Sequence, residues 1–269
     1  MMAEPRVRLD TLLAERGLFS SRSRAAVAVM AGEVLVGAGE RRAQKPGELV
    51  DPAEPISVRE GPAFVSRGGV KLANALVSSG LQVTRRRALD VGASTGGFTD
   101  CLLQSGAASV VAVDVGYGLL AWTLRTDPRV TVLERTNARA LTAAMLPYRP
   151  DLATIDVSFI SLSIVLPAVL RCMAEPYDVL ALVKPQFEVG RARVGKGGVV
   201  RDPATRRAAL VSVGEAALAL GASVLGYHSS GLPGPKGNRE TFIHLAEPTR
   251  AGRAGAAEAL SEMAREIEP

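Results

Sequence analysis

With 269 residues, of which 47% are hydrophobic and 22% charged, the chain is long enough for one large core and a smaller appended domain. The formal net charge of +5 is compatible with a polyanionic partner, and the two cysteines and two histidines are too few and too scattered for a disulfide framework or a zinc site. The N-terminus lacks the apolar segment of a signal peptide, and no apolar run approaches the roughly 20 residues that span a bilayer. We therefore expect a cytoplasmic protein with reduced thiols, no bound metal and no membrane partner.

Residues 6–58 predict a small α+β domain. A first helical stripe ends at Gly17, and Ser20 or Ser21 can cap a second helix that Gly32 ends before the strand-like "EVLV". The apolar residues expected to face the core of this domain are Leu9, Leu12, Leu13, Ala26, Val29 and Met30.

Two arginines fall in the first turn of that second helix, where a solvated helix face is the usual reading. However, "RLDTLLAERGLFSSRSRA", followed by "MAGEVLV" and "QKPGELV", resembles the αL RNA-binding fold of a small-subunit ribosomal protein, pseudouridine synthases and some tRNA synthetases. Residues 1–60 hold as many acidic as basic side chains, so RNA contact requires a local cluster of arginines. The resemblance implies phosphate contacts from Arg6, Arg8, Arg22 and Arg24.

Seven strand-like segments, with helical patterns between most of them, follow a short linker at 60–66. They are "RALDVGA", "SVVAVDVG", "VTVLER", "LATIDVS", "DVLALVKP", "ASVLGYHS" and "ETFIHLAE". Near-continuous apolar runs separated by helices predict a mostly parallel sheet covered on both faces. Seven strands fit the Rossmann-like sheet of class I methyltransferases, whose last pair includes an antiparallel strand. We expect an RNA-binding domain at 1–59, a methyltransferase domain at 67–250 and a helical tail at 251–269.

The stretch "RALDVGASTGGFTD" resembles the strand, turn and helix of a nucleotide-binding unit. A dinucleotide fingerprint starting at Gly92 would need glycine where Ser94 stands, and a P-loop would need lysine where Phe98 stands. The remaining common ligand is S-adenosylmethionine. Small residues would admit its amino-acid end, Asp90 could address its ammonium directly or through water, and Asp114 could accept hydrogen bonds from its ribose hydroxyls. A glycine-rich turn that only eases helix–strand packing is the alternative.

The predicted cofactor site extends beyond this turn. We expect Tyr117 and Trp122 near the adenine, with core packing as the rival interpretation, above all for Trp122. The full set of expected cofactor residues is Asp90, Gly92, Ala93, Ser94, Gly96, Gly97, Asp114, Val115, Asn137 and Asp156.

Transfer of a methyl group to a sugar hydroxyl would need a group that polarises or deprotonates a weak nucleophile and aligns it for in-line attack. Lys184 follows the apolar strand "LALV" and could serve, provided that carboxylates shape its surroundings. Asp156 and Glu240 stand at sheet positions that could converge on it.

The motifs "DVGASTGGFTD", "DVGYGLLAWTLRTDPRV", "ERTNAR", "DVSFISL" and "KPQFEVGR", with "GGVVRDP", together resemble the TlyA family. This family, often labelled hemolysin A, comprises two-domain, FtsJ-like ribosomal RNA ribose 2′-O-methyltransferases, and the resemblance covers about residues 6–247. It implies cytidine targets in ribosomal RNA and a catalytic tetrad of Lys71, Asp156, Lys184 and Glu240. By the resemblance Lys184 lies nearest the 2′-OH and acts as a base or as an orienting group, Asp156 and Glu240 position it, and Lys71 assists the substrate ribose.

A cationic segment follows Lys184 and predicts a mobile loop that contacts phosphates. Its further basic residues are Arg191, Arg193, Lys196, Arg201, Arg206 and Arg207. Phe187 could stack on a base flipped toward the site, or could pack on the helix after it. Besides the N-terminal arginines, the expected RNA contacts are Arg67, Phe187, Arg191, Arg193 and Lys196.

Two other functions compete with RNA methylation. A membrane-active hemolysin would match the older family label, but neither a spanning segment nor a strongly amphipathic cationic helix supports it. A non-catalytic RNA-binding or ribosome assembly factor is the other, and the intact tetrad argues against it. The expected partner is ribosomal RNA or a ribosomal subunit, and the sequence leaves the oligomeric state open.

Overall fold

The computed structural model describes residues 5–59, 62–190, 193–234, 236–250 and 257–268. Its internal contacts divide the chain into two compact units, Met1–Ala63 and Phe64–Pro269. Each unit has its own hydrophobic core, as expected of separately folding domains.

The N-terminal unit packs two helices, α1 (Leu9–Glu15) and α2 (Arg22–Ala31), against short strands. An antiparallel pair joins β1 (Val7–Arg8) to β4 (Leu49–Val50). A three-stranded antiparallel sheet has the order β3 (Arg41–Arg42), β2 (Val34–Val36), β5 (Ile56–Val58).

The expected ends of α2 are confirmed. Ser21 accepts a hydrogen bond from the backbone N–H of Arg24, and Gly32 ends the helix with a φ of 77°. One core expectation is wrong: Met30 is 74% exposed, because the buried face of α2 consists of Ala25, Ala28 and Val29. The buried face of the helix is therefore shifted by one residue from the predicted face. A short stripe of small apolar residues does not determine which face of a helix is buried.

The second unit is built on a seven-stranded sheet in the order β11-β12-β10-β9-β6-β7-β8. All seven predicted strands are present, and β12 runs antiparallel to β10 and β11. In chain order the strands are β6 (Arg87–Val91), β7 (Ser109–Val113), β8 (Val130–Leu133), β9 (Leu152–Ile155), β10 (Asp178–Val183), β11 (Ser223–Ser229) and β12 (Thr241–Ala246).

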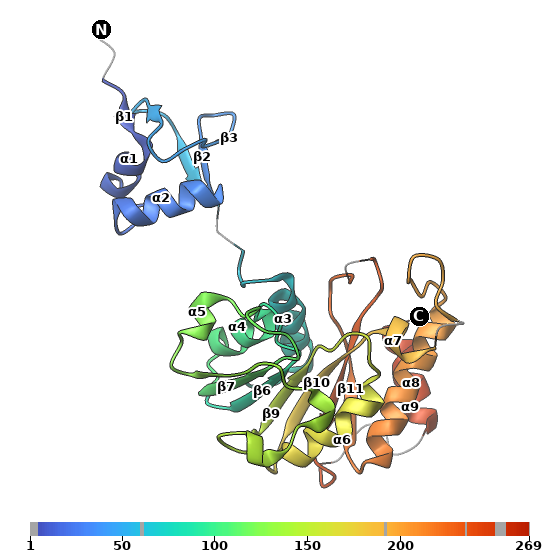
Figure 1. Cartoon of the computed structure of the whole chain (residues 1–269). Helices are drawn as coiled ribbons and strands as arrows, with labels where there is room; N and C mark the ends of the chain where they lie inside the picture. The colour runs from blue at the N-terminus through green and yellow to red at the C-terminus, as the bar shows by residue number, and fades with distance from the viewer. Residues whose placement is uncertain (1–4, 60–61, 191–192, 235, 251–256, 269) are drawn as a thin grey trace. The chain divides into compact units, whose positions relative to one another are not determined.

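Helices cover both faces of this sheet (Figure 1). One face carries α3 (Arg67–Ser79), α4 (Gly97–Gln104) and α5 (Trp122–Arg125), and the other carries α6 (Leu162–Cys172), α8 (Pro203–Ala219) and α9 (Ala257–Ile267). Short elements complete the unit: α7 (Pro185–Glu188) and the 3₁₀ turns η1 (Ala138–Ala140) and η2 (Ala143–Met145). Successive residues of β6 alternate between the two cores, with Leu89 and Val91 on the α6 side and Ala88 on the α4 side.

The ends of the second unit differ from the expected boundaries. Phe64 packs against the core on the α4 face, and the backbone N–H of Val65 donates to Asp100. These two residues therefore belong to the second unit rather than to a linker. Helix α9 likewise belongs to this unit, because Leu260, Met263 and Ala264 are buried in the core against α8.

Strands β6 and β9 pair in parallel although the chain between them first builds β7 and β8 on the other side of β6. Ligands of open α/β sheets bind where the strand order reverses in this way, beyond the carboxyl ends of the strands. Gly92 follows β6 there, and a Cβ atom at this position would lie only 2.5 Å from the carbonyl oxygen of Asp156 after β9. The site thus depends on a glycine at the seam of the sheet.

Gly92→Ala should lower the free energy of unfolding for two reasons, the left-handed φ of 85° and the clash with Asp156. Gly118→Ala is the matched control, because Gly118 has a φ of 70° but no atom within 4 Å of the added Cβ. The control should lose about 1–2 kcal/mol from the backbone conformation alone, and Gly92→Ala clearly more. Equal losses in urea unfolding would show that the contact with Asp156 costs nothing.

Candidate functional site

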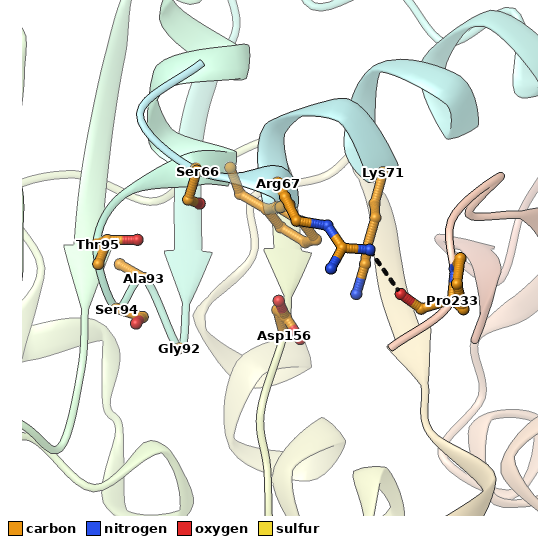
Figure 2. Close-up of a pocket in the computed structure, with 12 residues that line it drawn as sticks. Ser66, Arg67, Lys71, Gly92, Ala93, Ser94, Thr95, Asp156 and Pro233 are labelled. Carbon is orange, nitrogen blue, oxygen red and sulfur yellow. Dashed lines mark hydrogen bonds between the residues drawn. The ribbon is translucent and has the colours of Figure 1, made fainter. Parts of the chain in front are cut away.

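The glycine-rich turn borders a pocket of about 360 Å³ at the carboxyl end of β6. Figure 2 shows the turn on one side, with Lys71 and Asp156 projecting into the pocket from α3 and from the end of β9. Across the pocket, Arg67 Nη2 donates a 3.1 Å hydrogen bond to the carbonyl of Pro233. The predicted cofactor residues that line this pocket are Gly92, Ala93, Ser94, Gly97 and Asp156.

The pocket suits a compact polar ligand. Its volume lies within the range of about 300–1,000 Å³ typical of small-molecule sites. A Cβ at Gly97 would meet Ser66 Oγ at 2.2 Å, and one at Gly96 would meet Leu124 at 2.3 Å. Gly96 therefore lets the turn pack on α5, Gly97 lets the start of α4 approach the start of α3, and Gly92 lets the turn approach the backbone of Asp156.

Asp90 lies inside the protein rather than at the pocket surface. Its exposed fraction is 0%, and its two carboxyl oxygens accept hydrogen bonds from Thr99 at 2.7 Å and from Thr154 at 3.1 Å. Burial raises the pKa of this carboxyl to about 7. Helix α4 and strand β9 cover the carboxyl, and its contact with a ligand ammonium, directly or through water, stays a prediction. The residue anchors the turn from below.

Apart from Asp90 and Gly96, three predicted cofactor residues do not line the pocket. The carboxylate of Asp114 accepts the backbone N–H groups of Ser94 and Gly116, at 2.8 and 2.6 Å, and so fixes the turn. Val115 is exposed, and exposed Asn137 caps the turn η1 through the N–H of Arg139. Core packing of Trp122 is wrong, since the residue is 74% exposed.

The four residues of the expected tetrad line one second pocket of about 550 Å³. This pocket shares Lys71 and Asp156 with the glycine-turn pocket. The fold brings these four residues together from α3, from the ends of β9 and β10 and from the segment before β12. The shared residues place the tetrad at the junction between a ligand pocket and a larger opening.

The tetrad forms two ion pairs rather than one cluster around Lys184. Lys184 Nζ lies 2.5 Å from Asp156 Oδ1, and Lys71 Nζ lies 2.5 Å from Glu240 Oε2. Glu240 was expected to position Lys184 and instead binds Lys71. Gly234 makes this possible, because a Cβ there would lie 2.3 Å from Glu240 Oε1.

Ser158 is a site residue that sequence reasoning missed. Lys184 Nζ donates a 3.0 Å hydrogen bond to Ser158 Oγ. Asp156 Oδ1 lies 2.5 Å from the same ammonium, at the distance of an ion pair. Two partners, Ser158 and Asp156, therefore fix the direction of the ammonium.

An aromatic pair borders the same pocket. The rings of Phe159 and Phe187 lie 5.1 Å apart, and Phe159 is 91% exposed with a left-handed φ of 64°. Phe187 therefore contacts Phe159, which was not predicted as a site residue. Neither the exposure nor the backbone conformation of Phe159 has a signal in the sequence.

Glu188 connects α7 to the start of α6 beside this pocket. Its carboxylate accepts Ser161 Oγ at 2.6 Å and the backbone N–H of Leu162 at 3.0 Å, at the start of α6. Burial raises the pKa of Glu188. Gln186 also lines the pocket, and its Oε1 has no hydrogen-bond partner among the described residues.

The expected RNA contacts have different environments. Arg8 and Arg22 both pair with buried Asp10, at 2.8 and 3.1 Å, and the hydrogen bond from Arg8 lowers the pKa of Asp10 to about 2. Arg6, Arg24, Arg193 and Lys196 are exposed, and Arg191 lies outside the described residues. The prediction that Arg206 belongs to a mobile cationic loop is wrong, because this residue is buried in helix α8 and paired with Glu268.

Comparison with known proteins assigns the two units. Residues 64–247 match the model of the FtsJ-like methyltransferases. The chain belongs to the FtsJ-like methyltransferase family. Residues 7–56 match the S4 domain, so the N-terminal unit is an S4 domain.

Several relatives share both domains with this FtsJ-like chain. It is 49% identical to the 16S/23S rRNA (cytidine-2′-O)-methyltransferase TlyA of Mycobacterium tuberculosis, over 96% of this chain and 95% of that protein. Hemolysin A of Brachyspira hyodysenteriae is 37% identical over 89% of this chain and 99% of its own length. A solved structure of a hemolysin-like protein from Streptococcus thermophilus covers 98% of this chain and 96% of that one, with 40% identity and a TM-score of 0.72. The resemblance to the TlyA family is thus confirmed.

Among the described residues, no helix combines the length and the apolar character needed to cross a membrane.

Asp90→Asn tests the charge state of the buried carboxyl. The folded-state pKa of about 7 lies above the ordinary value, so the folded chain holds this proton more tightly than the unfolded chain. Wild-type stability should therefore fall as the pH rises through this window, and the variant lacks that loss. The stability of Asp90→Asn relative to wild type should rise by roughly 1.4 kcal/mol per pH unit between about pH 4 and 7. Urea unfolding across this range measures it, and a difference independent of pH would contradict the buried, protonated carboxyl.

Proposed function

We propose that this chain transfers a methyl group from S-adenosylmethionine to the ribose 2′-OH of cytidine in ribosomal RNA. One observation carries the proposal: the pairs Lys184–Asp156 and Lys71–Glu240 meet where the glycine-turn pocket joins the larger pocket. A donor in the first pocket and a ribose in the second would then face each other across Asp156 and Lys71. The ribosomal RNA and the cytidine follow the name of the M. tuberculosis relative.

The bound cofactor would supply an electrophilic methyl group, and the chain supplies alignment. Lys184, held by Asp156 and Ser158, has one N–H left for the substrate oxygen. In this arrangement the ammonium of Lys184 orients the hydroxyl for in-line attack. Once Lys184 has released a proton to solvent on substrate docking, its amine takes up the proton of the 2′-OH while the bond from sulfur to the methyl group breaks and the bond from oxygen to that carbon forms. Lys71, fixed by Glu240, lies at the boundary of both pockets and can hold a second oxygen of the ribose.

The remaining features suit an RNA substrate. Phe159 and Phe187 offer an aromatic surface beside the tetrad on which an unstacked base could lie. The S4 domain contributes Arg6, Arg8, Arg22 and Arg24, and exposed Arg193 and Lys196 add positive charge after β10. The partner is then a ribosomal subunit or its RNA, and the cytoplasm is the compartment where the reaction takes place.

Lys184→Arg tests the proposed chemistry. The guanidinium keeps the charge but cannot occupy the space between Asp156 and Ser158 with the same geometry, so methyl transfer should fall by about 10²-fold or more. The assay measures tritiated methyl transfer from S-adenosylmethionine to isolated ribosomal subunits, followed by mapping of alkali-resistant linkages. Lys45→Arg, at an exposed position of the S4 domain, is the control and should keep wild-type activity. Absence of transfer by the wild-type chain to either subunit would overturn the function.

Asp10→Asn tests the S4 surface through the sign of its effect. Simple charge arithmetic says that loss of an acid should strengthen RNA binding. Because Asp10 holds Arg8 and Arg22, we expect the opposite, a loss of about five- to tenfold in affinity for ribosomal RNA. Glu15→Gln on the exposed side of α1 is the matched control and should bind equally or more tightly. Binding isotherms at fixed salt concentration measure the affinity of each variant for ribosomal RNA. Tighter binding by Asp10→Asn would contradict the idea that Asp10 positions Arg8 and Arg22 for RNA.

A further inference from the structure

A buried carboxylate near the C-terminus has no part in the site described so far. Glu268 follows α9, and its side chain is only 5% exposed. Arg206 Nε and Nη2 lie 2.9 and 2.8 Å from Glu268 Oε2, and Arg239 Nη1 lies 3.5 Å from the same atom. Arg207 donates a 2.9 Å hydrogen bond to the Glu268 carbonyl. One residue thus gathers arginines from the start of α8 and from the segment before β12.

Arg206 links Glu268 to the segment that follows β10. Its Nη1 donates to the carbonyl of Arg201 at 2.6 Å and lies 3.5 Å from that of Val200. Arg206 is itself buried, so Glu268 neutralises the charge that allows this guanidinium to sit among backbone carbonyls.

Asn238 joins the same segment to the residues before β12. Its Oδ1 accepts the backbone N–H of Val200 at 2.9 Å, and its Nδ2 donates to the carbonyl of Gly198 at 2.8 Å. The backbone N–H of Gly234 donates to the carbonyl of Asn238 at 2.8 Å. Asn238 is buried, so these bonds are protected from competing water.

The two tethered segments form one wall of the tetrad pocket. Val194 and Gly198 come from the first segment, and Gly234, Asn238 and Glu240 come from the second. Glu240 and Glu268 also line a common pocket of about 380 Å³ on this segment. The glycine-turn pocket takes only Pro233 from this part of the chain.

We propose that Glu268 is a positioning residue of the methyl-transfer site. Through Arg206 and Arg239 it fixes the wall that carries Asn238 and Glu240, and Glu240 in turn holds Lys71. The expected effect of Glu268 on catalysis rests on the proposed function. Its effect on the pocket wall does not, because it is a property of the substrate-free protein. Loss of the carboxylate leaves Arg206 buried without a counter-charge beside Arg207 and Arg239, and this wall is the part that must shift to hydrate it.

Glu268→Gln in the full chain tests the proposal, with Glu262→Gln on the exposed side of α9 as the matched control. Hydrogen exchange of the substrate-free protein is the first measurement. The amides of Val200 and Gly234 should exchange at least about tenfold faster in Glu268→Gln, and the amides of Gly92 and Ala93, bonded to the carbonyl of Val113 in the glycine turn, should not change. Unchanged exchange at Val200 and Gly234 would overturn the proposal whatever the activity.

Methyl transfer to ribosomal subunits is the second measurement. The value of kcat/KM for the RNA should fall about tenfold or more, while the dissociation constant of S-adenosylmethionine stays within about twofold, because the wall lines the substrate pocket and barely touches the other. Normal kcat/KM in Glu268→Gln, with an active wild type, would remove its catalytic importance. Absence of methyl transfer by the wild-type protein would instead contradict the proposed function. Hydrogen exchange would still show whether Glu268 fixes the pocket wall.

A milder variant guards against a failure to fold. Should Glu268→Gln lose cofactor binding together with the thermal transition, Arg207→Gln removes the hydrogen bond to the Glu268 carbonyl and keeps the ion pair between Glu268 and Arg206. It should give the same exchange pattern at Val200 and Gly234 with a smaller increase. Equal exchange in Arg207→Gln and in wild type would then count against the tether.

Discussion

The close approach of Gly92 to the backbone of Asp156 is the constraint on which the site depends. Parallel pairing of β6 with β9 brings the glycine turn and Asp156 to one seam, and only a residue without Cβ leaves room for the carbonyl there. This seam fixes both pockets at once, because Asp156 lines each of them. The glycine-turn pocket and the tetrad pocket therefore share a wall because of the way the sheet is built.

A second theme is that cations with proposed roles are held by carboxylates that are buried or partly buried. Asp10 holds Arg8 and Arg22 in the S4 domain, Asp156 and Glu240 hold the two lysines, and Glu268 holds Arg206. Each pair costs desolvation, so none is strong evidence of a gain in stability. What these pairs provide is direction: a lysine or arginine with long, flexible stems reaches its target only when its partners restrict its rotamers.

Much of the fold followed from local patterns. Seven apolar runs gave seven strands, and Ser21 and Gly32 bounded α2, because capping and strand periodicity depend on a few neighbouring residues. The pattern failed at Met30, where a short helix of small apolar residues does not define its own inner face. It also failed for Phe159, since a left-handed backbone in an aromatic residue is imposed by surrounding structure.

The sequence by itself determined the family and the two domains and predicted the four tetrad residues, because motif spacing can be recognised without coordinates. Tertiary structure alone decided which residues meet. Glu240 pairs with Lys71 across 169 positions, and Asp90 is fully buried beneath the glycine turn. The link from Glu268 to Arg206 likewise spans 62 positions and joins the C-terminal helix to the wall of the tetrad pocket. Such contacts arise from the packing of distant elements around one sheet, and no local pattern encodes them.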